Sequence, residues 1–280
     1  MEIINIPALR NPRMILAFTG WNDAGEAASG AVDHLLSQWP GSKIAEMESE
    51  EFYDFQVNRP QVSLTESKMR TISWPTTSIY AVQTPQLAFD FVLVQGPEPS
   101  LKWKSFVSDL LDLADDLDVQ TIITLGALLA DVPHSRPIQV TGSAAHPEVA
   151  NRLGMEISHY QGPTGILGVI QEGAYRRAID CISLWSALPH YASASPSPKA
   201  TLALVNSLED FLDISIPQGD LAASAQIWES DVDELAEQDG DIAEYVKQLE
   251  DSKDAQDLPS ATGDEIAREF ERYLRRRSAE

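Results

Sequence analysis

Apolar residues in the first three quarters of the chain fall in short runs that alternate with helical patterns. Three of these runs are apolar at nearly every position: 91–94, 121–125 and 182–185. Such runs are typical of central parallel strands covered on both faces, whereas hairpin strands alternate between apolar and polar residues. The pattern therefore predicts an α/β sandwich with a mixed sheet.

The same pattern predicts the individual elements. We expect strands at 14–18, 44–48, 52–55, 70–74, 78–82, 90–95, 120–125, 138–141 and 181–187. We expect helices at 24–39, 101–117, 147–152, 165–178 and 199–211. Ser100 is the expected N-cap of the second helix. Because the segment from 44 to 82 has short strands with no helix between them, it predicts an antiparallel edge or flap.

The composition changes after about residue 218, where we expect one domain, 1–218, to give way to a helical extension, 219–280. Between 229 and 257 the chain has twelve acidic residues and two lysines. A capping box at 262–265 predicts a last helix that ends in three arginines, 275–277. The apolar stripes of this extension are too narrow to form a core, so its helices should pack on the α/β body or on a neighbouring subunit.

The net charge and the cysteine content restrict the classes of partner and the cellular location that we expect. The chain has 43 acidic and 20 basic residues, a formal net charge of −23, which disfavours nucleic acids and anionic membranes as partners. Cys181 is the only cysteine, so disulfides are excluded and a reducing cytosol is expected. No apolar run is long enough to span a membrane, and the N-terminus lacks the pattern of a signal peptide. We therefore expect a cytoplasmic protein without a cofactor.

The loop at 20–25 reads G-W-N-D-A-G and has the two glycines of a phosphate-binding P-loop, between an expected strand and an expected helix. A P-loop continues with Lys and then Ser or Thr, but here Glu26 and Ala27 stand in those places. With Asp23 beside it, the loop is anionic and would repel a triphosphate. Nucleotide hydrolysis by this loop is therefore excluded, and the loop needs another role.

Four loops follow the four strongest buried strands, and parallel strands would bring these loops to one edge of the sheet. The polar residues gathered there would be Asn22, Asp23, Glu98, His134, Arg136, His190 and Tyr191. Catalytic candidates among them are Asp23, Glu98, His134 and His190, which could act as acids or bases. The alternative is structural, since Asp and Glu commonly cap helices and loop histidines commonly bond to the backbone. The histidines are scattered, so no metal site is expected.

The stretch at 161–165, Q-G-P-T-G, opens the expected helix at 165–178. Glycines before a helix leave free N–H groups that can hold an anion, which makes Gly162, Thr164 and Gly165 candidate binding residues. A tight turn capped by Thr164 explains the stretch equally well, and a carboxylate from a neighbouring loop could also occupy such a position.

Several motifs, long and in order, resemble the actinobacterial branch of the PAC2 family, named for proteasome assembly chaperone 2. The motifs are G-W-N-D-A-G at 20–25, L-V-Q-G-P-E-P at 93–99, T-L-G-A-L-L-A-D-V-P-H-S-R-P at 124–137, G-P-T-G at 162–165 and L-P-H-Y at 188–191. They place Gly20, Trp21 and Gly96 among the candidate binding residues. The resemblance runs from about 14 to 211, and the helical tail is similar to the extension of that branch.

The resemblance implies a Rossmann-like α/β sandwich, similar in core to nucleoside phosphorylases, in proteins that form homo-oligomers. Relatives in eukaryotes and archaea are linked to proteasome assembly. Chaperones of this kind that dock on proteasome α-rings carry a C-terminal hydrophobic-Tyr-any tripeptide, whereas this sequence ends in Ser278-Ala279-Glu280. We therefore do not expect docking by that route.

These observations lead to two main hypotheses, and a purely structural oligomeric scaffold is a third that is compatible with them. The first is a non-catalytic, chaperone-like homo-oligomer, with a trimer as one candidate, that binds itself and a protein client such as proteasome subunits. The second is a binding protein or enzyme for a nucleoside- or phosphate-type small molecule, using the loops at the carboxyl edge of the strands. The acidity of the loop at 20–25 favours protein recognition at least as well as anion chemistry.

Overall fold

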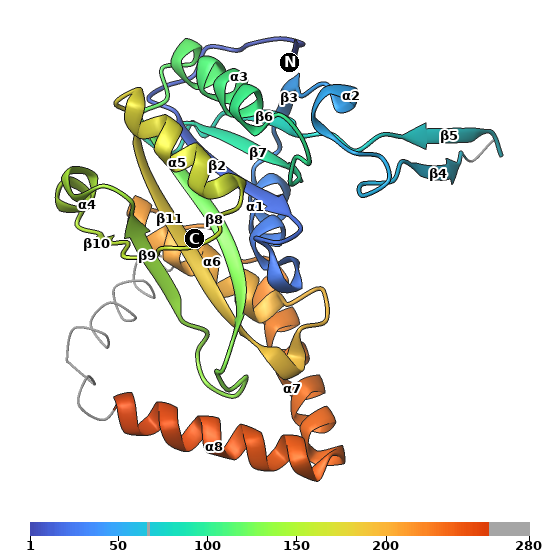
Figure 1. Cartoon of the computed structure of the whole chain (residues 1–280), viewed down its shortest axis with the longest axis vertical. Coiled ribbons are helices and arrows are strands. Elements are labelled where there is room, and N and C mark those ends of the chain that lie inside the picture. The colour runs from blue at the N-terminus through green and yellow to red at the C-terminus, as the bar shows by residue number, and fades with distance from the viewer. Residues whose placement is uncertain (66–67, 258–280) are drawn as a thin grey trace. The chain divides into compact units, whose positions relative to one another are not determined.

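A computed structural model describes residues 1–65 and 68–257 of the chain (Figure 1). The chain forms two compact units. Unit 1 consists of Met1–Asn22, Trp39–Leu125 and Gly142–Ser183. Unit 2 consists of Asp23–Gln38, Gly126–Thr141 and the residues from Leu184 onward.

The main sheet has nine strands in the order β1-β3-β6-β7-β2-β8-β11-β9-β10. Their bounds are β1 (Glu2–Ile3), β2 (Arg13–Thr19), β3 (Ser42–Glu46), β6 (Ser78–Val82), β7 (Phe91–Pro97), β8 (Thr121–Ala130), β9 (Val140–Ala144), β10 (Glu156–Ile157) and β11 (Asp180–Pro189). Strands β8, β9 and β11 each have residues in both units. The described residues thus form the α/β fold with a mixed sheet that the sequence predicts.

The centre of the sheet is parallel. Strand β2 pairs with β7 on one side and β8 on the other, so that Met14 lies opposite Val92 and Ile122. These three side chains are fully buried. Strands β3 and β6 continue the sheet in antiparallel fashion on the far side of β7, which confirms the predicted antiparallel edge. The central parallel strands are apolar because both of their faces are covered. The antiparallel strands at the edge are shorter and less covered.

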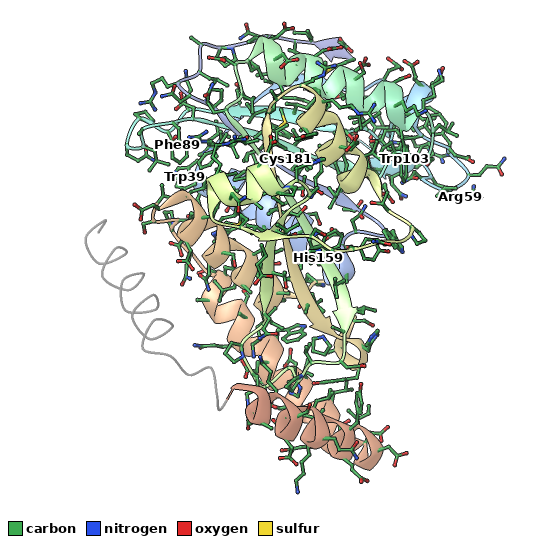
Figure 2. The ribbon with its side chains drawn as sticks, turned by 60° about the vertical axis from the view of Figure 1, so that its left-hand side comes forward. Trp39, Arg59, Phe89, Trp103, His159 and Cys181 are labelled. Carbon is green, nitrogen blue, oxygen red and sulfur yellow. The ribbon has the colours of Figure 1, made fainter. Side chains whose placement is uncertain are left out.

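Among its described residues, unit 1 has four helices: α2 (Ser49–Phe52), α3 (Trp103–Asp116), α4 (Pro147–Leu153) and α5 (Ile166–Arg176). Phe106 of α3 packs edge-to-face on Phe18 and Phe52, with ring centroids 5.8 and 5.3 Å apart. Cys181 is buried (labelled in Figure 2), and burial raises the pKa of its thiol well above its usual value. This thiol is therefore a core residue rather than a nucleophile.

Unit 2 is mainly helical among its described residues. Its elements include η1 (Ala24–Glu26), α1 (Ala27–Gln38), η2 (His190–Ala192), α6 (Pro198–Leu212), α7 (Leu221–Gln238) and α8 (Gly240–Asp257). Helix α6 packs against both α1 and α7, and α8 follows α7 and contacts it. No helix in the described ranges is long and apolar enough to cross a membrane.

A separate two-stranded hairpin, β4 (Gln61–Leu64) and β5 (Arg70–Ser73), extends from unit 1 and stands apart from the main sheet (Figure 1). All eight of its strand residues are exposed. This hairpin is the predicted flap, although β4 itself is not among the expected strands.

Two predictions are wrong. The strand expected at 52–55 is instead the end of the single-turn helix α2 and the turn that follows it. Phe52 and Tyr53 are held by tertiary contacts rather than by a ladder, since Phe52 packs on Phe106 and the Tyr53 hydroxyl bonds to Thr77 at 2.6 Å. Aromatic residues are common in strands, so two adjacent aromatic residues suggest a strand when the residues that they pack against are unknown.

The N-cap of α3 also differs from the prediction. The helix begins at Trp103, with Lys102 as N-cap residue in a left-handed conformation. The Ser100 hydroxyl donates to Oδ1 of Asn58 at 3.1 Å instead of capping the helix. The helix expected beyond residue 262 lies outside the described residues. The division of the chain into 1–218 and 219–280 stays a prediction.

Candidate functional site

The predicted site residues fall into two groups, one in each compact unit. The group in unit 1 lies where β2 and β7 end side by side, with Thr19 opposite Pro97. The backbone N–H of Glu98 donates to the carbonyl of Thr19 at 2.9 Å, which extends the pairing by one residue. Parallel pairing thus fixes the start of both following loops at one edge of the sheet.

Glu98 connects this edge to a helix. One carboxylate oxygen, Oε1, accepts from the backbone N–H of Ile166 at 2.8 Å and from the Asn22 side-chain amide at 2.7 Å. Because Ile166 is the first residue of α5, the carboxylate lies at the positive end of that helix. A carboxylate from a neighbouring loop therefore occupies the position where an anion would otherwise bind.

Asn22 is packed tightly against the turn before α5. Its side chain is 1% exposed, and a Cβ atom on Gly165 would lie 2.2 Å from its Oδ1. A larger residue at 165 would force Asn22 or the turn to shift. Since Nδ2 donates to Glu98, Oδ1 must face the other way, and this buried oxygen has no hydrogen-bond partner among the described residues.

The other residues of this group are less enclosed. Gly20 has φ +123°, a conformation that favours glycine, and turns the chain toward Trp21, which is 65% exposed. Gly96 lies against the backbone of residues 76 and 77, where a Cβ would be 2.5 Å from the Thr76 carbonyl oxygen. Gly162 and Thr164 lie in the exposed turn before α5.

In unit 2, Asp23 holds the start of α1. Its carboxylate accepts from the backbone N–H of Ala28 at 2.7 Å and from the Ser29 hydroxyl at 2.5 Å, and Asp23 is 5% exposed. Desolvation raises the pKa of this carboxyl, and the hydrogen bonds from Ser29 and Ala28 partly oppose that rise. The geometry is that of a helix-capping residue.

His134 is almost fully buried, at 1% exposed, in the loop after β8. The Tyr191 hydroxyl lies 2.7 Å from the backbone nitrogen of His134 and 2.7 Å from its Nδ1. The Asp233 carboxylate beside Nε2 can only accept, so the proton of the neutral ring is on Nε2 and the Tyr191 hydroxyl donates to Nδ1. Nε2 donates to Oδ1 of Asp233 on α7 at 2.9 Å. Both ring nitrogens are therefore engaged, and burial raises the pKa of Tyr191 to about 12.

Arg136 joins the same loop to α8. Its Nε and Nη2 donate to the two carboxylate oxygens of Asp254, each at 2.8 Å, and its Nη1 lies 3.3 Å from Oε1 of Glu250. The Asp254 carboxylate raises the pKa of Arg136. This fork is a strong form of ion pair because two parallel N–H bonds fix its geometry.

His190 is 53% exposed at the side chain, and its Nε2 lies 3.9 Å from Oδ1 of Asp131. Asp131 also accepts from the Tyr245 hydroxyl at 2.8 Å. The loop after β8 thus meets α7 and α8 through polar contacts, and its partners on these helices are residues that sequence reasoning missed. They are Asp233, Tyr245, Glu250 and Asp254. The acidic run at 229–257 was the available indication, but it does not identify which acids face inward.

The gathering of all these residues into one site stays a prediction. Within the described ranges, no group of three or more His, Cys, Asp or Glu residues is arranged to hold a metal ion. Each group consists instead of capping and bridging contacts that fix loops to helices.

The chain is similar to known proteins over most of its length. The family model described as PAC2 family matches residues 17–236. A crystal structure of a PAC2 family protein from Streptomyces avermitilis is 48% identical, with 84% of this chain and 99% of that chain covered and a TM-score of 0.78. The Mycobacterium tuberculosis proteasome-assembly chaperone homologue Rv2125 is 43% identical, with the same coverage and a TM-score of 0.76.

A more distant structure shares the fold alone. The archaeal proteasome activator PbaB from Pyrococcus furiosus is 18% identical, with 83% of this chain and 96% of that chain covered and a TM-score of 0.66. No curated protein matches the sequence.

Proposed function

The chain belongs to the PAC2 family, and from this premise we propose that it is a non-catalytic, chaperone-like interaction protein that forms a homo-oligomer and binds a protein client. The observation that carries the proposal is the β4–β5 hairpin of unit 1.

The hairpin is amphipathic, but its apolar face is uncovered. The register places Val62 opposite Ile72 and Leu64 opposite Arg70, while Ser63 faces Thr71 on the other side. Val62, Leu64 and Ile72 are 53%, 68% and 56% exposed. An isolated two-stranded hairpin is marginally stable in water, so an apolar face of this kind supports a packing partner.

The packing partner that we propose for this face is a second copy of the chain, because the face is almost without charge. With a formal net charge of −23, two copies repel each other through most of their surface. Contact between copies must therefore be made where charge is sparse. The apolar side of the hairpin carries one charged strand residue, Arg70, which is favourable on an acidic protein.

Native mass spectrometry tests the oligomer. We expect the wild-type protein to be an oligomer at micromolar concentration and the double variant Leu64→Ser, Ile72→Thr to be a monomer. The matched control is Ile4→Thr with Ile157→Thr, two apolar residues of unit 1 that are 55% and 38% exposed but lie outside the hairpin. A wild-type monomer, or an oligomer that survives the hairpin variant, contradicts the proposed role of the hairpin.

The client is proposed from a relative. The Mycobacterium tuberculosis protein at 43% identity is named as a proteasome-assembly chaperone homologue, and we propose a proteasome-related client for this chain. The test mixes the protein with separately purified α- and β-type proteasome subunits and follows particle formation by native mass spectrometry. Faster formation, or a complex with one subunit type, is expected. An unchanged rate with no complex contradicts this client.

The small-molecule alternative has less support. A phosphate-type ligand would need the N-terminus of α5, and the Glu98 carboxylate already accepts the N–H of Ile166 there. His134 would serve as a base only after losing its contacts with Tyr191 or Asp233.

A further inference from the structure

Glu98 uses its two carboxylate oxygens unequally. The donors from Ile166 and Asn22 both fall on Oε1, and within the described residues Oε2 has no hydrogen-bond partner. Glu98 is partly exposed, and Oε2 is not one of the fully buried atoms without a partner in the described residues, so it has some access to solvent. An ionised carboxylate can accept about four hydrogen bonds, and Glu98 thus presents an unused negative oxygen in a fixed direction.

Asn22 helps to hold the Glu98 carboxylate in this direction, although the side-chain oxygen of Asn22 itself has no hydrogen-bond partner among the described residues. Asn22 is 1% exposed and donates to Glu98, while its Oδ1 is buried against Gly165 without a donor. An unpaired buried oxygen destabilises the folded state. A capping role alone needs only the bond from Ile166 to Glu98, so the position of Asn22 is better explained by a need to hold the carboxylate still for a ligand.

Two exposed aromatic side chains come from the loops that meet at this carboxylate. Trp21 directly precedes Asn22 and is 65% exposed. Tyr160 is 67% exposed, and its hydroxyl donates to the carbonyl of Pro163, in the turn that leads to Gly165. The Tyr160 ring lies over Gly162, since a Cβ there would be 3.1 Å from the ring carbon Cζ. This contact holds the ring in place rather than leaving it free to move.

A carboxylate oxygen with aromatic rings on the adjoining loops is suited to bind a cation. Indole and phenol faces attract ammonium and guanidinium groups, and a carboxylate bonds to both. We propose that the Glu98 carboxylate receives a lysine or arginine side chain of a partner protein, with Trp21 and Tyr160 contacting the cation or its aliphatic stem. The inference rests on the proposed role as an interaction protein and gives its client a chemistry: a basic segment.

A protein segment fits better than a small amine. Small-molecule sites bury most of their ligand, whereas Trp21 and Tyr160 have about two thirds of their surface exposed. Exposed aromatics beside a charged group are typical of contacts with another protein. The net charge of −23 also attracts a basic segment and repels an acidic one.

The test uses the full-length protein with 15N-labelled tryptophan and the pentapeptide Gly-Ser-Arg-Ser-Gly, capped at both ends, and reads the Trp21 indole resonance. That resonance is assigned by its loss in Trp21→Phe. A peptide with citrulline in place of arginine is the uncharged control, and free butylamine distinguishes a small amine from a peptide. We expect the arginine peptide to shift Trp21, the citrulline peptide to leave it unchanged, and butylamine to bind more weakly than the peptide.

Glu98→Gln is the decisive variant, because the amide oxygen of Gln can still accept from Ile166 while the charge is gone. We expect it to raise the Kd about tenfold, the usual effect of losing a charged hydrogen bond. The matched control, Glu156→Gln, removes a charge from an exposed position of unit 1 and should leave the Kd within about twofold. Tyr160→Ala, which leaves Glu98 intact, should weaken binding as well.

Three results overturn the inference: no shift with the arginine peptide, equal shifts with both peptides, or equal losses in Glu98→Gln and Glu156→Gln. Tighter binding of butylamine than of the peptide would overturn the protein source. Native mass spectrometry of Glu98→Gln separates this inference from the homo-oligomer, because the variant should keep the wild-type subunit number. If the hairpin variant loses the oligomer but binds the peptide as the wild type does, peptide binding at Glu98 does not depend on the oligomer.

Discussion

Asp23 carries a carboxylate into the interior of unit 2 because the first turn of α1 supplies donors to receive it. Ala28 and Ser29 both donate to it, yet desolvation is the largest influence and raises its pKa above the ordinary value of 3.8. The folded state therefore binds a proton more readily than the unfolded state does. It follows that this group contributes stability fully below about pH 3.8 and loses that contribution as the pH rises through the folded-state pKa.

Asp23→Asn tests this sign, because asparagine keeps an acceptor for Ala28 but does not titrate. We expect the free energy of unfolding of the wild type, relative to the variant, to fall as the pH rises from about 4 toward neutrality. The measurement is urea unfolding at a series of pH values. Asp33→Asn, an exposed position on the same helix, should show no such trend. A difference that grows with pH would contradict the raised pKa.

Gly165 illustrates a second constraint at the scale of single residues. A Cβ at this position would lie 2.2 Å from Oδ1 of Asn22, so one of the two must move. We expect Gly165→Ala to lower the free energy of unfolding by about 1–3 kcal/mol, as overpacking does in tight interiors. Gly240→Ala is the control, since its Cβ would meet no atom within 4 Å. Thermal unfolding distinguishes the two, and equal effects would contradict the contact.

The local sequence predicted the structural role of some of these residues but not of others. Asp23 was predictable as a helix cap, since it directly precedes the helix expected at 24–39. The role of Glu98 was not, because its donor Ile166 is 68 positions away and only folding joins them. The glycines at 162 and 165 suggested an anion site, and a single sequence cannot show that a carboxylate of the same chain occupies the end of the helix.

Among the elements, the central strands were predicted best because each is a continuous apolar run whose burial is local information. The residues 52–55 failed for the opposite reason: Phe52 is buried by Phe106 of α3, and nothing nearby in the sequence reports that contact. Strand β4 was missed although its residues alternate between polar and apolar, because it is only four residues long and all of them are exposed. The apolar pattern does not predict an element when its residues are buried by partners distant in the sequence. It also fails when no residue of the chain buries them.

Helix α8 shows how a weakly amphipathic element is attached. Val246 is its one buried residue among those whose side chains are described, and polar contacts join the helix to the loop after β8. The fork from Arg136 to Asp254 is the strongest of these contacts. A helix bound in this way should open locally more often than a helix with a broad apolar face.

Arg136→Gln should therefore release α8 without unfolding unit 2. We expect amide hydrogen exchange in α8 to become several-fold faster, and the same change to follow from raising the salt concentration in the wild type, since partly exposed ion pairs are screened. Arg152→Gln is the matched control, because it breaks a comparable pair with Asp180 in unit 1. Exchange in α8 that ignores both the variant and salt would show that the helix is held by its apolar contact instead.

For the whole molecule, the net charge of −23 and the uncovered apolar face of the hairpin act in opposite directions. Charge keeps copies apart, whereas the proposed association buries Val62, Leu64 and Ile72 and would stabilise a hairpin that is marginal alone. If the folded chain associates and the unfolded chain does not, association must add to stability by mass action.

The melting temperature of the wild type should consequently rise with protein concentration, and it should rise further at higher salt, where repulsion between the acidic surfaces is screened. Leu64→Ser with Ile72→Thr should remove the concentration dependence and leave the melting temperature near the dilute wild-type value, because the hairpin stands outside the main core. Differential scanning calorimetry over a hundredfold concentration range measures both. The Ile4→Thr, Ile157→Thr protein should keep the dependence. A wild-type melting temperature that does not change with concentration would contradict association of two copies through the hairpin.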